Sequence, residues 1–380
     1  MEPFAGAWQR GVVDTSHKNL FQFSPLFRCV TLIASDVAKL GVRLVELTDG
    51  IWQETSSPAF SPVLRKPNRY QTWIQFAESW MLSKLTTGNV FVLKVRDNRG
   101  VVVALYALDP HRVTPLVAPG AAVFYKLASD NLSTVGDAVT VPASEIIHDR
   151  MNTLYHPLVG VPPIAAAGLA GALGVEMQKQ PATFFKNGAR PGGYLTAPAG
   201  IGKETADRLK TQWEQNYGGE NYGKTAVLGD GLKYETIAMT AIDAQLVEGL
   251  KLSGEMVCHA FGVPLFKVGL GQMPANSNVA VLNQIYYSDC LQKLIEDFEW
   301  SIDDGLALPM NYGVELIIDN LLRMDAQSQM STLKEGVSAG IIAPNEGRKK
   351  VRLRPEKAGE SQYLQQKNWS HADLANRSAI

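Results

Sequence analysis

The pattern of hydrophobic positions predicts three helices in the middle of the chain, over residues 164–180, 242–261 and 278–300. The second helix presents one apolar face, made of Leu246, Leu250, Val257 and Phe261. The third presents another, at spacings of four, made of Leu282, Tyr286, Cys290, Leu294 and Phe298. Because Gly262 and Pro264 follow the second helix, its end is well defined.

The first of these helices carries Gly168, Gly171 and Gly174 three residues apart, and therefore on one face. Each interior glycine costs roughly 1 kcal/mol of helix propensity relative to alanine. Such a row predicts that another backbone approaches closely. The alternative is an ordinary alanine-rich core helix.

A small α/β unit is predicted between the first two helices. Residues 203–217 form a helix with Ala206, Leu209, Trp213 and Tyr217 along one side, and Gly218 and Gly219 end it. Two strand-like segments, TAVL and LKYETI, then flank a Gly-Asp-Gly turn at 229–231, which is typical of a hairpin.

A segment without formal charge follows the second helix, between Lys267 and Asp289. It contains several glycines and leads directly into the third helix, which anchors it. We expect this loop to have a function, because a surface loop normally carries charge.

The flanking regions predict a scaffold of the α+β class. A helix begins at Ser24-Pro25 and a second one is capped by Thr72. Strands are predicted at 42–47, 89–95, 101–108 and 314–319, with a hairpin turn at Asp97-Asn98-Arg99-Gly100. The first domain closes near residues 145–150, and the chain from Asp325 onward is helical with turns at Gly340 and Pro344.

Charge limits the classes of partner. The chain has 380 residues, which fits two or three domains, and 36 Lys and Arg against 37 Asp and Glu, a formal net charge of 36 − 37 = −1. Tight non-specific binding to nucleic acid needs a basic excess, so any contact with DNA is expected to be weak or transient.

Cys29, Cys258 and Cys290 are odd in number, far apart and without a CxxC pair, which argues against a disulfide framework or a zinc site and favours a reducing compartment. The first residues do not resemble a secretion signal. Residues 158–175 are uncharged, but they are interrupted by Pro162-Pro163 and fall below the ~20 apolar residues that a membrane span requires, so we expect no membrane association.

One segment of the chain matches the sequence pattern of a catalytic motif. Residues 218–225 read GGENYGKT, which satisfies the P-loop pattern. A P-loop needs a buried strand before it and a helix after it, because loop amides and the helix N-terminus hold the phosphates. The predicted order is reversed, since a helix ends at Tyr217 and a strand follows Lys224. We interpret GGENYGKT as a glycine-rich helix exit and keep a P-loop nucleotide hydrolase as the enzyme alternative.

No other catalytic set is predicted. His148 and His156 are expected around a loop, and Cys258 and His259 are adjacent, so they point to different faces of a helix. Asp109 and Asp149 are expected in turn or capping roles. We expect no catalytic residues, no metal and no cofactor.

The order of several segments nevertheless resembles a family, the portal proteins of tailed bacteriophages of the HK97 type. The segments that carry the resemblance are FRCVTLIASDVAKL, KPNRYQT, LTTGNVFVLKVRDNRG, ALDPHRV, EIIHDR, GVPPIAAA, FFKNGARPGGYL, LKTQWEQNYGG, DAQLVEGLKLSGEMVCHAFGVP and IIAPNEGRKKVRL. The resemblance implies a ring of about twelve identical subunits at one capsid vertex of a virion, with double-stranded DNA passing non-specifically along its axis. It also implies synthesis in the host cytoplasm.

The resemblance implies a division of the chain into the parts of a portal subunit. These are an α/β wing (1–161 and 279–324), a stem of two helices (162–189 and 241–264), a small α/β clip (190–240), a tunnel loop (265–278) and a helical crown (325–380). In related chains the first stem helix continues into FFxNGA, whereas Pro181 stands here. An interior proline costs ~3 kcal/mol, so we expect this helix to kink or restart at Pro181.

The implied site residues fall into three groups. The channel-facing loop consists of Gly269, Leu270, Gly271, Gln272, Met273, Pro274, Ala275 and Asn276. Stem packing between subunits is assigned to Gly168, Gly171 and Gly174, and partner docking on the clip to Lys203, Arg208, Trp213, Tyr217 and Lys224. The implied partners are the terminase large subunit, the major capsid protein and a head-completion or tail-connector (adaptor) protein. A monomeric adaptor module remains the third alternative.

Overall fold

The computed structural model describes residues 2–3, 20–133, 135–186, 193–196, 202–217, 233–236, 242–272, 279–318, 326–351, 353–364 and 369–370. These residues divide into two compact units. The first comprises residues 1–277 and 285–317, and the second comprises residues 278–284 and 318–380.

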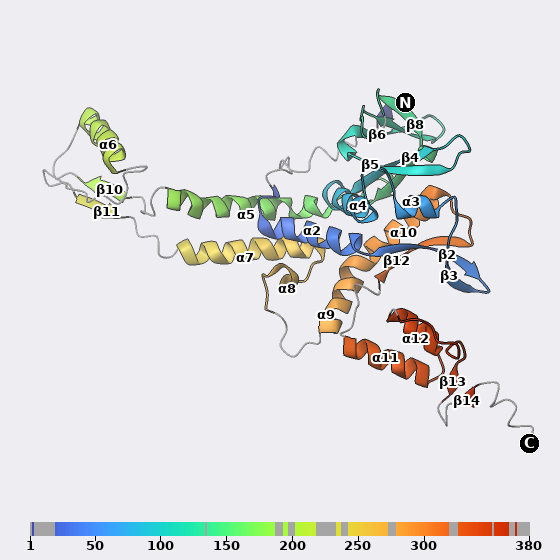
Figure 1. Ribbon diagram of the computed structural model, residues 1–380. Coiled ribbons are helices and arrows are strands. Elements are labelled where there is room, and N and C mark those ends of the chain that lie inside the picture. Colours follow the sequence, from blue (N-terminus) through green and yellow to red (C-terminus); the bar gives the residue numbers. More distant parts are fainter. Residues whose placement is uncertain are drawn as a thin grey trace, which may run out of the picture. The chain divides into compact units, whose positions relative to one another are not determined.

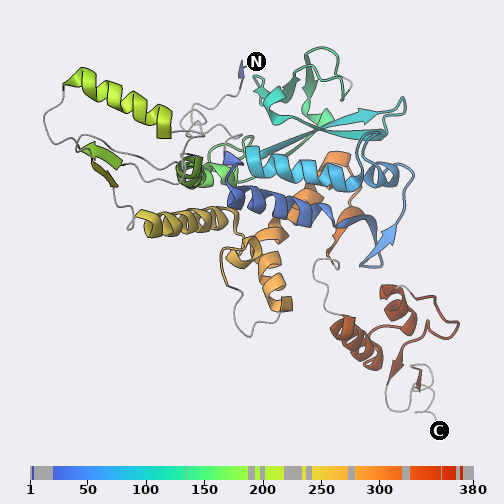
Figure 2. The ribbon, with the colours of Figure 1, turned by 60° about the vertical axis from the view of Figure 1, so that its left-hand side comes forward.

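The first unit contains the scaffold of helices and strands predicted near the N-terminus (Figure 1). Its helices before residue 200 are α2 (Ser24–Ala38), α3 (Ser61–Arg65), α4 (Trp73–Thr87) and α5 (Pro163–Lys186). Pro25 occupies the first turn of α2, and Thr72 forms a capping box with Gln75 at the start of α4, as the sequence predicts. Helices α2 and α4 lie against each other (Figure 2).

Three sheets organise the strands of this region. The three-stranded sheets have the orders β12-β2-β3 and β5-β4-β9, and a four-stranded sheet has the order β1-β6-β7-β8. All pairings are antiparallel. The strands are β1 (Glu2–Pro3), β2 (Gly41–Thr48), β3 (Ile51–Thr55), β4 (Asn89–Arg96), β5 (Val102–Leu108), β6 (Val113–Val117), β7 (Val123–Leu127), β8 (Val139–Pro142), β9 (Ile146–Arg150) and β12 (Tyr312–Ile317).

The sequence predicts the β4–β5 hairpin correctly, and Gly100 in its turn adopts a positive φ of 81°. Two pairings are long-range. Strand β9 pairs with β4 and is the third strand of that sheet. Strand β12 pairs with β2, although most of the sequence separates the two strands. A buried cluster that includes Phe91, Leu108 and Tyr125 joins the β4 sheet to the β6–β7 sheet.

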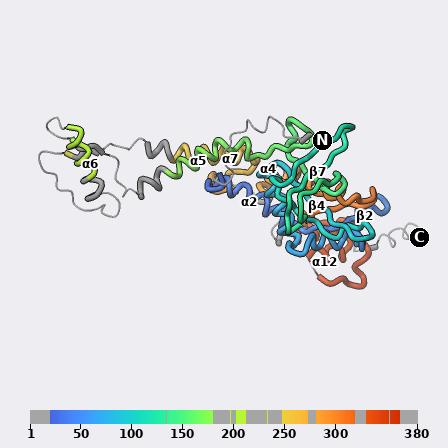
Figure 3. The backbone as a smooth tube through the Cα atoms, turned by 90° about the horizontal axis from the view of Figure 1, so that it is seen from above, coloured from blue at the N-terminus to red at the C-terminus, as the bar shows by residue number. Residues whose placement is uncertain are grey.

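Helices α5 and α7 (Ile242–Phe261) run antiparallel and side by side (Figures 1 and 3). The predicted bounds of α7 are confirmed, and Gly262 follows it with a positive φ of 66°. Helix α5 is continuous to Lys186, so it does not restart at Pro181, whereas a kink at this residue stays a prediction. The proline removes one N–H donor, but the antiparallel packing of α5 on α7 favours the helix over the rest of its length.

Between these helices, the structure describes α6 (Lys203–Tyr217) and two antiparallel strands, β10 (Gly193–Thr196) and β11 (Lys233–Thr236). The predicted helix is confirmed, and so is a strand within LKYETI. This strand, β11, pairs with β10, which the sequence pattern does not predict. The Gly-Asp-Gly turn, TAVL and GGENYGKT lie outside the described residues.

The third central helix is longer than predicted and is not uniform. It consists of α9 (Val279–Tyr286), a π-helical turn η5 (Tyr287–Leu291) and α10 (Gln292–Leu306). Residues spaced by four from Tyr286 to Phe298 would drift by about 120° around an ideal α-helix. A π turn contains one extra residue, and this extra residue offsets about 100° of the drift. Tyr286, Leu294 and Phe298 can therefore all lie on the buried side of the helix.

The second unit carries the predicted C-terminal helices. These are α11 (Ala326–Ser338) and α12 (Pro344–Lys350), with Gly340 between them at a positive φ of 71°. Short strands β13 (Tyr363–Leu364) and β14 (Trp369–Ser370) pair with each other. Among the described helices, none is long and apolar enough to cross a membrane.

Candidate functional site

The segment that follows α7 is built on a short, well-capped helix. Pro264 precedes α8 (Leu265–Val268), and Gly269 ends it in the left-handed conformation with φ 82°. The Lys267 ammonium lies 4.7 Å from the centre of the Tyr286 ring, a cation–π contact that ties α8 to the third central helix. Burial lowers the pKa of Lys267. The start of the uncharged loop is therefore held in place.

The loop residues themselves differ in environment. Leu270 is half-buried and packs against Gly254 of α7, where an added Cβ would lie 2.6 Å from a Leu270 methyl carbon. Gln272 is exposed, and residues 273–276 lie outside the described part of the chain. Leu270 thus packs on its own chain, whereas Gln272 is available to a partner.

The glycine face of α5 is covered by residues from the start of the described chain. All three glycines are buried. A Cβ added at Gly171 would meet Leu20 at 3.5 Å, and one added at Gly174 would overlap the Phe23 ring. The groups that approach Gly171 and Gly174 are side chains of the same chain. Packing between subunits at this face stays a prediction.

On α6, Lys203 and Arg208 are exposed, as a docking role requires. Trp213 and Tyr217 belong to the same helix, and Lys224 lies outside the described residues. The docking role of this unit stays a prediction.

A buried ion cluster fixes the base of the scaffold. The Lys84 side chain of α4 is fully buried, and its Nζ lies 2.8 Å from Asp149 Oδ2 on β9 and 3.1 Å from Asp297 Oδ2 on α10. The Trp80 indole N–H donates to the same Asp149 carboxylate at 2.8 Å. This cluster joins α4, β9 and α10, and it assigns Asp149 a buried ion pair instead of the predicted turn or cap.

As predicted, two histidines lie around a loop: His156 forms an isolated bridge with Val159 in the segment after β9, and His148 lies within β9 itself. Its ring nitrogens lie 2.9 Å from the Tyr125 hydroxyl and 3.2 Å from Asn89 Oδ1. Burial lowers the pKa of His148 to about 3, which keeps the ring neutral. Asp109 accepts a hydrogen bond from the His111 backbone N–H, which confirms the predicted capping role.

Cys29 and Cys258 are a second pair of residues whose contact the sequence does not predict. Their Sγ atoms lie 3.8 Å apart where α2 packs on α7, and both are free thiols. Among the described residues, no group of three His, Cys, Asp or Glu side chains is arranged to hold a metal ion.

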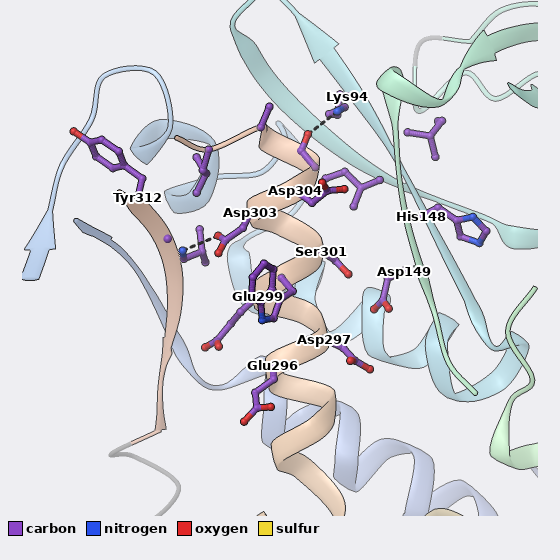
Figure 4. Close-up of a pocket in the computed structure, with 18 of the residues that line it drawn as sticks. Lys94, His148, Asp149, Glu296, Asp297, Glu299, Ser301, Asp303, Asp304 and Tyr312 are labelled. Carbon is purple, nitrogen blue, oxygen red and sulfur yellow. Dashed lines mark hydrogen bonds between the residues drawn. The ribbon is translucent and has the colours of Figure 1, made fainter. Parts of the chain in front are cut away.

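A groove of about 1390 Å³ runs along α10 between β9 and β12 (Figure 4). We call it the acidic groove and define it by Glu296, Glu299, Trp300, Asp303, Asp304 and Met310. Two of its carboxylates hold the free edge of β12: Asp303 accepts from the Val314 N–H at 2.7 Å and Glu299 from the Leu316 N–H at 2.6 Å. Burial raises the pKa of Glu299 to about 7 and that of Asp303 to about 6.

Lys94 fixes the far end of the groove. This buried side chain of β4 donates from Nζ to the Gly305 carbonyl at 2.5 Å, near the C-terminus of α10, and burial lowers its pKa. Together with the ion cluster, this bond positions α10 rigidly against the sheet.

Comparisons with known proteins identify related chains. The family model described as "Phage portal protein" matches residues 24–351. The portal protein of Enterobacteria phage HK97 is 26% identical over 363 residues, which cover 92% of this chain and 83% of the relative. The resemblance inferred from the sequence is therefore confirmed.

Solved structures share the fold. A chain from the neck of the native GTA particle, determined with C12 symmetry, superposes with a TM-score of 0.62 at 21% identity and covers 93% of this chain and 96% of its own. An HK97 family phage portal protein from Corynebacterium diphtheriae superposes with a TM-score of 0.58 at 16% identity, over 81% of this chain and 96% of its own.

Proposed function

Because this chain belongs to the phage portal protein family, we propose that it is a structural protein of the virion, located at one capsid vertex, whose copies assemble into a closed ring. Double-stranded DNA passes along the axis of this ring during packaging and ejection. The observation that carries the proposal is the family match over residues 24–351. The C12 symmetry of the neck with the same fold supports twelve subunits.

The parts of the subunit take different roles in this proposal. The α5–α7 pair forms the stem, the α6 unit is the clip that docks the terminase large subunit and later the connector proteins, and the scaffold around β4 is the wing that faces the major capsid protein. Residues 325–380 form the crown. Heterologous contacts between identical subunits close into a ring when the rotation per subunit divides a full turn.

The uncharged loop after α8 lines the channel. Neutral side chains such as Gln272 contact phosphates without holding them, because Lys and Arg contacts are what add affinity and salt dependence. DNA therefore slides past this surface independently of its sequence.

The first experiment tests assembly. Electron microscopy of the purified protein should show rings with an axial hole, and sedimentation should show a large closed oligomer. Sedimentation of monomer alone across a wide range of concentration and salt would falsify the ring.

The second experiment tests the loop. Gln272→Arg should leave the melting temperature and ring assembly unchanged but impair DNA packaging, because every subunit repeats the new charge around the axis. Leu270→Arg is the contrasting variant, since it removes a contact with α7 and should lower the melting temperature first. Normal packaging by assembled Gln272→Arg rings would contradict the channel placement.

The third experiment tests the enzyme alternative. Helix α6 ends at Tyr217, directly before GGENYGKT, which is the reverse of P-loop order. Calorimetry with ATP and Mg²⁺ should therefore detect no saturable binding. Binding that is lost in Lys224→Ala would support a nucleotide hydrolase instead.

A further inference from the structure

The acidic groove carries features that its structural role does not require. Trp300 is 72% exposed and Met310 fully exposed, although exposed large apolar side chains of this kind are typical of protein interfaces. Glu296 and Asp304 are also exposed, and in the part of the chain that the structure describes no Lys or Arg nitrogen lies within ion-pair distance of either. The groove thus presents apolar surface beside two exposed carboxylates. Lys94 and Arg150 also line it, but Lys94 donates to the Gly305 carbonyl and Arg150 to the Pro157 carbonyl.

A surface of opposite charge occurs in the same unit. We call residues 65–70 the cationic loop, in which Arg65, Lys66, Arg69 and Tyr70 are exposed. None of the three cations has a carboxylate within ion-pair distance among the described residues, and the Arg69 guanidinium lies 4.7 Å from the Tyr70 ring centre. Ile74, which follows on α4, is 55% exposed. This surface therefore combines positive charge with an apolar patch.

The cationic loop is rigid because Asn68 holds it from inside. Asn68 is buried, and its Oδ1 accepts from the backbone N–H groups of Tyr70 at 2.9 Å and Gln71 at 2.8 Å. Its Nδ2 donates to the Leu105 carbonyl at 2.9 Å. A loop fixed in this way loses little conformational freedom on binding, which favours affinity.

The two surfaces lie at opposite edges of one sheet. The cationic loop binds the outer edge of β5, where the Leu105 N–H donates to the Pro67 carbonyl at 2.7 Å. The acidic groove is lined by β9, the opposite edge strand, and by Lys94 of the central strand β4. Since the strand order is β5-β4-β9, the two edge strands are separated by two inter-strand spacings, roughly 10 Å. Different and complementary surfaces on opposite edges are what head-to-tail contacts between identical subunits need.

We propose that the acidic groove of one subunit receives the cationic loop of the next subunit in the ring. Arg65, Lys66 and Arg69 face Glu296 and Asp304 of the neighbour, and Tyr70 and Ile74 pack on its Trp300 and Met310. This inference rests on the proposed ring, and it names the contact that sets the order of its subunits.

Charge reversal tests the contact. The variant Lys66→Glu/Arg69→Glu and the variant Glu296→Lys/Asp304→Lys should each raise the subunit concentration for half-assembly at least about tenfold, because like charges then face each other. A chain with all four substitutions restores opposite charges and should assemble within about threefold of the native protein. Lys126→Glu and Asp137→Lys, exposed in the same unit, are the matched controls and should change little.

A zero-length carbodiimide cross-link provides an independent readout. Rings made from a mixture of ¹⁵N-labelled and unlabelled chains should give peptides that join Lys66 to Glu296 or Asp304 with mixed labels. Melting curves of each variant monomer establish that it folds.

The outcomes separate this inference from the proposed function. If the native chain never forms rings, the proposed function is wrong and this contact with it. The groove does not hold the neighbour's loop if native rings form and the charge reversals do not weaken them. The same conclusion follows if the variant with four substitutions needs as high a concentration for half-assembly as the variants with two. Docking of a capsid protein in the groove would give this second result.

Discussion

Different contacts hold together the scaffold around Lys84 and the α5–α7 pair. In the scaffold, a buried lysine bridges two carboxylates from separate elements at 2.8 and 3.1 Å. In the helix pair, small residues accept bulky neighbours, such as Gly174 against Phe23 and Gly249 against Met177. Charged hydrogen bonds have one productive geometry, whereas apolar contacts between a glycine and a long side chain tolerate small displacements. Removal of one partner is therefore expected to cost more stability in the scaffold than in the helix pair.

The largest effect should come from removing the cation of the scaffold. Lys84→Met leaves Asp149 buried with only the Trp80 indole as partner, so the free energy of unfolding should fall by about 3 to 5 kcal/mol. Urea unfolding measures this loss. Lys126→Met, at an exposed position of β7, is the control and should change stability by less than about 0.5 kcal/mol.

A paired variant sharpens the interpretation. In Lys84→Met/Asp149→Asn the second buried charge is removed too, so the double variant should lose less stability than the two single variants added together. Additive losses would mean that Lys84 and Asp149 contribute independently, with Lys84 acting through Asp297 instead.

A smaller effect is expected in the helix pair. Gly174→Ala places a methyl group 2.5 Å from Cζ of the buried Phe23 ring, so the ring must shift, and the change should cost about 1 to 3 kcal/mol. Gly171→Ala is the matched variant on the same face. Its methyl would meet Leu20 at an ordinary 3.5 Å, so the gain in helix propensity should leave the protein equally stable or more stable by up to about 1 kcal/mol. Equal melting temperatures for the two variants would disagree with this packing.

The smallest effect concerns pH. The pKa of Glu299 is raised to about 7 in the folded state, above its unfolded value, so its contribution to stability is present at low pH and is lost as pH rises through about 7. Glu299→Gln keeps an oxygen acceptor for the Leu316 N–H but does not titrate. The variant should therefore gain stability relative to the native chain between pH 5 and about pH 8, as followed by urea unfolding across that range. A difference that does not vary with pH would contradict the raised pKa.

His148 changes stability with pH in the opposite direction to Glu299, in the acidic range. The effect of Glu299 must therefore be measured as a difference between the native chain and Glu299→Gln. Its lowered pKa means that its contribution to stability is present at neutral pH and is lost as pH falls toward about 3. The pH profile of the native protein alone would combine both effects. The difference between the native chain and Glu299→Gln isolates the carboxylate.

Local patterns in the sequence suffice for much of the fold. The capping box at Thr72, the hairpin that ends at Gly100 and the Gly262 end of α7 are all encoded within a few residues, and all are confirmed. The extension of the third central helix to Leu306 is missed, although residues at spacings of four already indicate that an ideal α-helix does not fit.

Contacts between distant residues are harder to predict. Lys84 and Asp149 are 65 positions apart, and only pairing of β9 with β4 brings the carboxylate to α4. The helical period from Trp80 does place Lys84 on the buried face, which is a signal for a buried cation but not for its partner. The acidic groove likewise combines α10, β9 and β12, so charge counts along the chain do not reveal it.

The π-helical turn between α9 and α10 has a geometric consequence of its own. In a continuous α-helix the direction of every side chain follows from counting residues, at about 100° and 1.5 Å for each. At Tyr287–Leu291 one residue is in excess of that count. Deleting one residue from the turn would therefore rotate Tyr286 by about 100° relative to Leu294 and Phe298, out of the buried apolar face, although none of these three side chains would have changed.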